Sequence, residues 1–296
     1  MKLIKAEVLG CCMGVRRAVG MAYTETARQN PAEAPVYTMG PLIHNPQVLS
    51  DLRARGVETL DEEALPKTLE NAVVIIRAHG ITPQLETELT ARGARLVDAT
   101  CPKVKASQLK VRSLREAGYH VFLAGERCHG EIIGIQGFAP GCVIVANREE
   151  AEAAAAAVAE KLFCGSGINS TKTALLAQTT ISPEEYRAIG EGIARFFPQV
   201  EIIDTICGAT RDRQDALKRL CAGVDAVIVA GGRDSANTRR LLAIAQAQGK
   251  PCWLAESAAD IPREIAAYTT VGLSAGASTP DAVIDNIAAA LQAVSP

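Results

Sequence analysis

The sequence predicts an α/β protein of three similar α/β units with mostly parallel sheets. Short β-branched runs alternate with turns and helical stretches along the 296 residues. The runs at 72–77 and 225–230 are apolar without strict alternation, which is typical of parallel strands buried on both faces. Strands that alternate with helices in this way form parallel sheets covered by helices.

Along the chain, the predicted elements follow a repeating pattern of strand, turn and helix. The N-terminal run at 2–8 predicts the first strand, and alanine-rich segments at 149–160, 236–248 and 282–294 predict helices. We expect strands at 2–8, 36–39, 72–77, 95–98, 120–124, 142–146, 173–178, 201–206, 225–230, 252–255 and 269–273.

Two similar boundaries divide the chain into thirds. Thr100-Cys101-Pro102 follows one predicted strand, and Ile206-Cys207-Gly208 follows another. We therefore expect units at 1–99, 100–200 and 201–296, the last ending in a helix.

Composition excludes several classes of protein. The chain is 48% hydrophobic and 22% charged, with a net charge of −2, so no overall basic field attracts nucleic acid or a membrane surface. The N-terminal run lacks a signal-peptide core, and runs such as 72–76 are too short to cross a bilayer. The odd count of nine cysteines argues against a secreted disulfide framework, so we expect a cytoplasmic protein with free or metal-bound thiols.

Three cysteines, one in each third, stand between a predicted strand and a predicted helix. These are Cys12, Cys101 and Cys207, and in a layered α/β fold such junctions lie at one edge of a sheet. Thiolates at helix N-termini have a lowered pKa and are good ligands for soft metals. Three thiolates on iron would leave one coordination position open, as in catalytic metal sites.

The other cysteines fit this pattern less well. Cys11 adjoins Cys12, and neighbouring side chains diverge, whereas a ligand role for Cys128 beside His129 stays open. No Cys-x-x-Cys pair gives a ferredoxin or zinc-ribbon spacing. The remaining four are interpreted as core residues: Cys142, Cys164, Cys221 and Cys252.

Polar residues follow the predicted strands, where parallel sheets bind their ligands. Three of the four histidines, His44, His79 and His129, lie in such turns, although each alone could be a structural residue. Glu131 follows His129 by two residues; in a semi-buried pocket it would keep a proton near neutral pH, and a solvent-facing glutamate is the alternative.

Two strand-to-helix junctions near the C-terminus offer anion sites. Ser278-Thr279-Pro280-Asp281 is typical of a helix start with an oxygen-bearing cap, and Ser235 and Asn237 stand at a similar junction. Such helix starts present backbone N–H groups to anions, although ordinary capping is the alternative. The chain has neither a P-loop nor a dinucleotide-binding fingerprint.

Short segments between residues 10 and 278 together resemble the 4-hydroxy-3-methylbut-2-enyl diphosphate reductase family, the LytB or IspH family. The segments are Gly10-Cys11-Cys12-Met13-Gly14-Val15-Arg16-Arg17-Ala18, Ile43-His44-Asn45, Ala78-His79-Gly80, Asp98-Ala99-Thr100-Cys101-Pro102, His129-Gly130-Glu131, Gln178-Thr179-Thr180, Ile206-Cys207-Gly208-Ala209-Thr210 with Arg213-Gln214, Ser235-Ala236-Asn237 and Ser274-Ala275-Gly276-Ala277-Ser278.

The resemblance implies pseudo-threefold symmetry around a [4Fe-4S] cluster. It implies that the three cysteines named above hold the cluster and leave one iron open. It also implies that Thr179 and Glu131 face the allylic alcohol of the substrate. The residues implied for the diphosphate pocket are His44, His79, His129, Ser235, Asn237 and Ser278.

The chain departs from the family pattern at three places, which affects the pocket geometry more than the reaction type. Gly130 replaces a common proline, Ala236 replaces a frequent serine, and Arg211-Asp212 varies from a Thr-Asn pair.

The resemblance implies a reductive dehydroxylase. It would convert (E)-4-hydroxy-3-methylbut-2-enyl diphosphate to isopentenyl and dimethylallyl diphosphates, the last step of the non-mevalonate isoprenoid pathway. Electrons would come from a separate donor, because no flavin or nicotinamide fingerprint is visible. The resemblance implies that this donor is reduced ferredoxin or flavodoxin and that Glu131 supplies protons. Two alternatives stay open: a zinc-dependent hydrolase using the same Cys and His residues, and a non-enzymatic iron–sulfur sensor.

Overall fold

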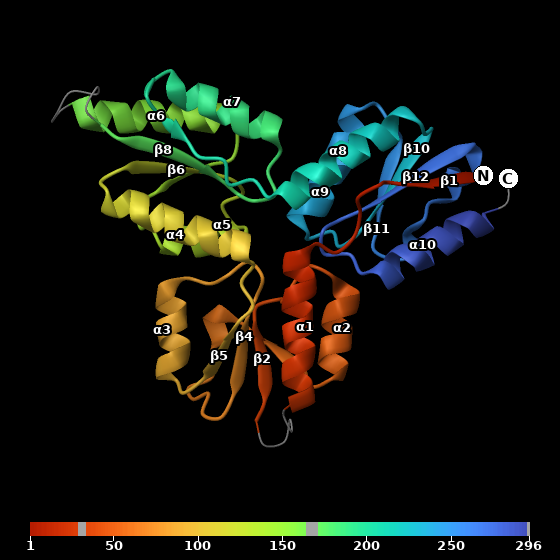
Figure 1. Cartoon of the computed structure of the whole chain (residues 1–296), viewed down its shortest axis with the longest axis horizontal. Coiled ribbons are helices and arrows are strands. Elements are labelled where there is room, and N and C mark those ends of the chain that lie inside the picture. The colour runs from red at the N-terminus through yellow and green to blue at the C-terminus, as the bar shows by residue number, and fades with distance from the viewer. Residues whose placement is uncertain (29–33, 164–170, 295–296) are drawn as a thin grey trace. The chain divides into compact units, whose positions relative to one another are not determined.

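The computed structural model describes residues 1–28, 34–163 and 171–294 (Figure 1). Two compact units divide the chain, 1–60 with 208–296 and 61–207. The strands group into three parallel sheets of four strands each, which confirms the predicted α/β class. Cys164 lies outside the described residues.

The first unit combines the N-terminal and C-terminal parts of the chain. Its elements are β1 (Lys2–Lys5), α1 (Met13–Arg28), β2 (Val36–Met39), α2 (Pro46–Ala54), β3 (Val57–Leu60), α8 (Gly208–Ala222), β10 (Ala226–Ala230), α9 (Ala236–Ala247), β11 (Cys252–Ala255), β12 (Thr270–Ala275) and α10 (Asp281–Ala293), with short 3-10 turns at Ala258–Asp260 and Arg263–Ala267.

A parallel sheet in the order β1-β12-β10-β11 forms the main core of this unit. Along β10, Ile228 packs on the α10 side, whereas Val227 and Val229 pack on the side of α8 and α9. Both faces are thus covered by helices, as Figure 1 shows. This burial explains why the strand sequence is apolar without alternation.

The remaining two strands of the first unit, β2 and β3, pair in parallel from Val36 opposite Val57 to Met39 opposite Leu60. Helix α2 starts between them, because Pro46 occupies its first turn and the Asn45 side chain accepts a hydrogen bond from the backbone N–H of Val48 at 3.1 Å. This cap fixes the end of the loop that carries His44.

The second unit contains the middle of the chain. Its elements are a 3-10 turn (Glu62–Ala64), β4 (Val73–Ile76), α3 (Pro83–Ala91), β5 (Arg95–Asp98), α4 (Pro102–Glu116), β6 (His120–Ala124), α5 (Gly130–Gly137), β7 (Val143–Val145), α6 (Arg148–Phe163), β8 (Thr173–Ala177), α7 (Pro183–Ala194) and β9 (Glu201–Ile202).

A parallel sheet in the order β7-β6-β8-β9 forms its main core. Phe122 and Leu175 face helices α6 and α7, and Leu123 and Leu176 face α4 and α5, so this sheet is also covered on both sides (Figure 1). Strands β4 and β5 form a further parallel pair in this unit.

Two differences from the predicted strands have local causes. Strand β3 was not predicted: its central residues, Glu58 and Thr59, are exposed and polar, so the four-residue run lacks an apolar signal. The predicted strand at 201–206 is wrong beyond Ile202. There the Thr205 side chain, in place of the backbone, bonds to the neighbouring strand: its hydroxyl accepts the backbone N–H of Ala177 at 2.8 Å and donates to the Ala177 carbonyl at 2.7 Å.

None of the helices in the described part of the chain is long and apolar enough to cross a membrane.

Candidate active site

The three candidate cluster cysteines each stand immediately before a helix, as predicted. Cys12 precedes α1, Cys207 precedes α8, and Cys101 is the N-cap residue of α4. The Cys101 side chain makes no capping hydrogen bond to its helix. All three are half-buried and free of disulfide bonds.

Backbone hydrogen bonds tie each cysteine to a loop after another strand. The N–H of Cys12 donates to the Ala277 carbonyl, beyond β12, at 3.0 Å. In the second unit, the N–H of Cys101 donates to Ala78, beyond β4, at 2.9 Å, and that of Cys207 to Thr179, beyond β8, at 3.0 Å. The cysteines therefore lie at carboxyl ends of strands, where α/β proteins bind ligands.

The helices that follow these cysteines, α1, α4 and α8, have no acidic residue in the first turn. Helices α6 and α7, by contrast, each begin with two acidic residues, which the positive end of the helix dipole favours. The cysteine helices leave that positive end available to a thiolate or another anion.

This donor set fits an iron–sulfur cluster. Thiolates are the usual ligands of such clusters, and three of them leave one iron without a protein ligand. Burial raises the pKa of the neighbouring Cys11 thiol to about 11, which favours its protonated form in the absence of a metal. Cys142 and Cys221 are buried in hydrophobic clusters, as predicted, and Cys128 is exposed.

Glu131 and Thr179 form a buried pair in the second unit. Glu131 is 1% exposed in the first turn of α5. Its Oε1 accepts the backbone N–H of Thr179 at 2.6 Å, and its Oε2 lies 2.8 Å from the Thr179 hydroxyl. Because the Thr179 carbonyl also accepts the backbone N–H of Cys207, the carboxyl group lies close to the backbone of Cys207.

The pKa of Glu131 is raised to about 7, because burial penalises the carboxylate more than the two bonds from Thr179 stabilise it. A carboxyl group with this pKa carries a proton for part of the time at neutral pH. When protonated, it can donate to the Thr179 hydroxyl and pass a proton through it. The arrangement is therefore suited to general acid catalysis.

His79 and His129 lie side by side in the second unit, with ring centroids 5.0 Å apart and planes at 81°. The Nδ1 atom of His129 accepts the backbone N–H of Glu131 at 3.2 Å, capping α5. In the neutral ring this places the proton on Nε2, so His129 is a donor on the side away from its helix.

The first unit contributes a polar group of side chains beyond β10 and β12. The Ser278 hydroxyl donates to the His44 carbonyl at 3.1 Å and lies 3.5 Å from the Ser235 hydroxyl. Ser235 caps α9, and its neighbour Asn237 is only 4% exposed. Both amide atoms of Asn237 lack a hydrogen-bond partner among the described residues. A buried amide of this kind can take its missing partners from a ligand or from an ordered water molecule.

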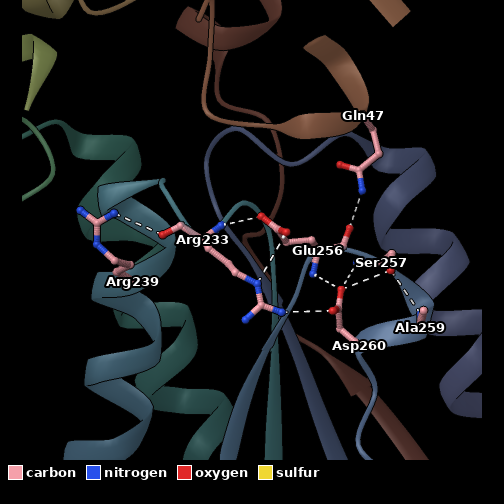
Figure 2. A network of polar contacts seen from close by, with 7 residues as sticks. All are labelled: Gln47, Arg233, Arg239, Glu256, Ser257, Ala259 and Asp260. Carbon is pink, nitrogen blue, oxygen red and sulfur yellow. Dashed lines mark hydrogen bonds and ion pairs between the residues drawn. The ribbon is translucent and has the colours of Figure 1, made fainter. Parts of the chain in front are cut away.

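A network of polar contacts, which sequence reasoning missed, holds these loops in place (Figure 2). The side chain of Gln47 donates to the Glu256 carbonyl at 2.7 Å, and the backbone N–H of Arg233 donates to the Glu256 carboxylate at 2.8 Å. The Arg233 guanidinium binds Asp260 at 3.1 Å. Gln47 follows His44 by three residues and Arg233 precedes Ser235 by two, so the network links both loops.

The sequence model of the LytB protein family matches residues 3–292. This chain belongs to the LytB family. One relative, from Treponema denticola, is 44% identical over 287 residues, covering 96% of this chain and 96% of that protein. Another, from Aquifex aeolicus, is 36% identical over 297 residues, covering 99% of this chain and 96% of that protein. Both relatives are named 4-hydroxy-3-methylbut-2-enyl diphosphate reductase.

Solved structures of two such enzymes share the fold of this LytB chain. The E-1-hydroxy-2-methyl-but-2-enyl-4-diphosphate reductase of Plasmodium falciparum aligns with a TM-score of 0.86 at 28% identity, covering 97% of this chain and 87% of that one. A second structure is described as (E)-4-hydroxy-3-methyl-but-2-enyl diphosphate reductase, the terminal enzyme of the non-mevalonate pathway. It aligns with a TM-score of 0.66 at 36% identity and covers 99% of both chains.

The structure corrects one prediction about the LytB chain's C-terminal helix. Neither Ser278 nor Thr279 supplies the expected oxygen-bearing cap: α10 begins at Asp281 with Pro280 as N-cap residue and no side-chain cap. The Thr279 hydroxyl donates instead to the Ala230 carbonyl at 3.1 Å. Proline occupies the cap position with its fixed φ, and the Ser278 hydroxyl bonds instead to the loop of His44.

Replacing Asn237 by leucine tests the ligand role of the buried amide. Leucine has a similar volume and removes two polar atoms without partners, so we expect the melting temperature of the unliganded protein to stay the same or rise. The affinity for inorganic pyrophosphate, measured by calorimetry, should fall by about 10- to 100-fold, the loss expected for hydrogen bonds to a charged group.

The matched control is Asn286→Leu, on the exposed face of α10, which should leave the affinity unchanged. Unchanged pyrophosphate binding by Asn237→Leu would exclude this amide from the pocket.

Proposed function

We propose that this chain removes the hydroxyl group of (E)-4-hydroxy-3-methylbut-2-enyl diphosphate to give isopentenyl and dimethylallyl diphosphates. The shared name of its relatives supports this activity. The observation that carries it is the position of Thr179. Its backbone N–H and its hydroxyl group both bond the buried carboxyl group of Glu131. Its carbonyl oxygen accepts the backbone N–H of Cys207. A protonated acid linked through Thr179 to Cys207 suits a reaction that needs both electrons and protons.

The proposed cofactor is a [4Fe-4S] cluster held by Cys12, Cys101 and Cys207. When bound, the cluster supplies electrons and a Lewis-acidic iron for the allylic C–O bond. The cysteines' contribution is to hold it at the carboxyl ends of the strands without a fourth protein ligand. The absence of acids from the first turns of their helices supports a negatively charged group at this place.

The diphosphate is proposed to be held by hydrogen-bond donors of two kinds. Ser235, Asn237 and Ser278 supply hydroxyl and amide groups, and the imidazole rings of His44, His79 and His129 supply N–H donors. Binding the diphosphate fixes the position of the hydroxymethyl end of the substrate. The reacting bond is then held beside the catalytic groups and does not have to meet them by diffusion. The two unpaired amide atoms of Asn237 support this assignment most directly.

Protons are proposed to come from Glu131 through Thr179. The C–O bond breaks and a C–H bond forms, so each turnover consumes two electrons and two protons and releases one water. One proton leaves with the hydroxyl oxygen and the other enters the allyl group. The pKa of about 7 lets Glu131 release a proton and recover it from solvent near neutral pH.

The remaining parts of the proposal concern the setting of the enzyme. Electrons would come from reduced ferredoxin or flavodoxin, and the enzyme would work in the cytoplasm, where thiols stay reduced; the free state of the described cysteines supports this. The proposed division into units at 1–99, 100–200 and 201–296 around the cluster is supported by the number of parallel sheets, with β1 of the first unit pairing with β12 of the last.

Oxygen sensitivity tests the proposed cluster. An iron without a protein ligand is exposed to oxidation, so protein purified in air should be depleted in iron and nearly inactive. Reconstitution with iron and sulfide without oxygen should restore reduction of the substrate. Iron, acid-labile sulfide and substrate conversion are measured on one preparation, before and after reconstitution.

Two outcomes would contradict the proposal. Bound zinc without sulfide in protein prepared without oxygen would favour a zinc hydrolase. A full cluster without substrate conversion would favour a sensor.

A further inference from the structure

Helix α5 turns glycines toward the loop that carries His79. Gly130, Gly134 and Gly137 share one face of the helix, because they are spaced by four and three residues. A Cβ atom on Gly134 would lie 3.3 Å from the His79 carbonyl oxygen, and one on Gly137 would lie 2.6 Å from the Thr82 side chain. Glycine is a poor helix former, so these positions serve a close approach of the loop to α5.

At the start of this face, the guanidinium group of Arg77 covers Gly130. A Cβ atom on Gly130 would lie 2.9 Å from the Arg77 Cζ atom and 2.9 Å from Nη2, which is closer than real contacts allow. A larger residue at this position would displace the guanidinium from its place over the helix start. The backbone of Gly130 has a negative φ, so glycine is not needed for its conformation.

The Arg77 guanidinium has no carboxylate partner within hydrogen-bond distance among the described residues. Its Nε donates to the Gly80 carbonyl at 3.4 Å, and the more distant Glu62 contributes only through its charge. Burial lowers the pKa of Arg77, although an arginine stays charged at neutral pH. A half-buried cation in this position is stabilised when an anion binds beside it.

The groups around Arg77 also favour an anion. Arg77 directly follows β4 and lies two residues before His79. Gly130, which the Arg77 guanidinium covers, is the first residue of α5 and directly follows His129. The two imidazole rings are in contact, and the positive end of the α5 dipole points to the same place. The guanidinium, the two imidazole rings and the start of α5 thus come from neighbouring residues, and each of them favours negative charge.

We propose that Arg77 is a further phosphate-binding residue of this enzyme and that Gly130 is the residue that admits its guanidinium. The planar guanidinium matches two phosphate oxygens through parallel N–H donors, which an ammonium group cannot do. The inference rests on the proposed function, because it assigns Arg77 to the diphosphate of the same substrate.

The direct test compares Arg77→Gln and Arg77→Lys with the reconstituted wild-type enzyme. We expect Arg77→Gln to raise KM for the substrate and the inhibition constant for inorganic pyrophosphate by roughly 10- to 100-fold, the effect of one lost charge-assisted contact. For Arg77→Lys we expect both constants to lie between those of the wild-type enzyme and Arg77→Gln, because lysine keeps the positive charge and lacks the paired N–H donors of the guanidinium. The matched control, Arg112→Gln on α4, should change neither constant, since it removes only an exposed pair with Glu116.

A second variant, Gly130→Ala, tests the glycine. Its methyl group must displace the guanidinium, so pyrophosphate inhibition should weaken in the wild-type background and not weaken further in Arg77→Gln. Alanine favours the helix, so the melting temperature should not fall. Additive effects of the two substitutions would overturn the role of Gly130.

Wild-type KM and pyrophosphate inhibition in Arg77→Gln would overturn the role of Arg77, whatever its effect on the melting temperature. Calorimetric binding of pyrophosphate separates this failure from a failure of the proposed function. If the wild-type enzyme does not reduce the substrate yet Arg77→Gln still loses pyrophosphate affinity, only the proposed activity is wrong.

Discussion

Glu131→Gln should bind the cluster and pyrophosphate normally and reduce the substrate about 10²- to 10⁴-fold more slowly, the usual cost of losing one general acid. Glutamine keeps the shape of the side chain: its oxygen can accept the backbone N–H of Thr179, and its amide can donate to the Thr179 hydroxyl. It cannot release a proton. Rates are measured with saturating substrate and reductant, next to Glu149→Gln, an exposed glutamate on α6.

The pH dependence of this pair has a definite sign. Because the pKa of Glu131 is about 7, the rate limited by proton donation should fall as pH rises above 7 in the wild-type enzyme, and this dependence should disappear in Glu131→Gln. Turnover of Glu131→Gln at the wild-type rate would exclude Glu131 as the acid.

Stability should follow the same titration. The pKa of the folded state lies above the ordinary value of 4.5, so the folded protein binds more protons than the unfolded chain between the two values. The stabilisation from protonated Glu131 is therefore complete below pH 4.5 and is lost as pH rises through 7. The difference in melting temperature between the wild-type protein and Glu131→Gln should change over this interval and stay constant above it.

Replacing Cys12, Cys101 or Cys207 by serine should abolish stable cluster binding and all activity. A serine hydroxyl is a hard, weakly acidic ligand that holds iron poorly in place of a thiolate. Iron and sulfide contents and the visible absorbance are measured after reconstitution without oxygen. Each variant should stay folded, because none of the three side chains lies in the buried core.

The controls are alanine substitutions of Cys142, Cys221 and Cys252, which should keep the cluster absorbance. Cys142 and Cys221 are buried in hydrophobic clusters, and Cys252 packs against one of them. Full iron and sulfide content in Cys12→Ser would show that the ligands are assigned wrongly.

Much of the fold could be predicted because parallel strands and helices leave strong local signals. The buried strands are continuous apolar runs. Each of the three cysteines stands directly before a helix, between that helix and the preceding strand. Strand β3 gives no such signal, because its two central residues face solvent. Thr205 replaces ladder hydrogen bonds with its side chain, which no periodicity reveals.

The site was predictable only in part. The positions of His79, His129 and Glu131 at strand ends indicated a pocket, and their roles came from the resemblance. The contact between Glu131 and Thr179 joins residues 48 apart, so no local pattern could give it. The same holds for the unpaired amide of Asn237 and for Arg77 over Gly130, which depend on packing between elements.

The most direct measurement counts electrons against products. Reconstituted enzyme is reduced without oxygen, mixed with (E)-4-hydroxy-3-methylbut-2-enyl diphosphate, and the products are quantified by mass spectrometry as reductant is consumed. We expect isopentenyl and dimethylallyl diphosphates to appear together, with two electrons used for each product molecule formed. Release of free phosphate or pyrophosphate without consumption of reductant, or no product from fully loaded enzyme, would contradict the proposed reductive dehydroxylation.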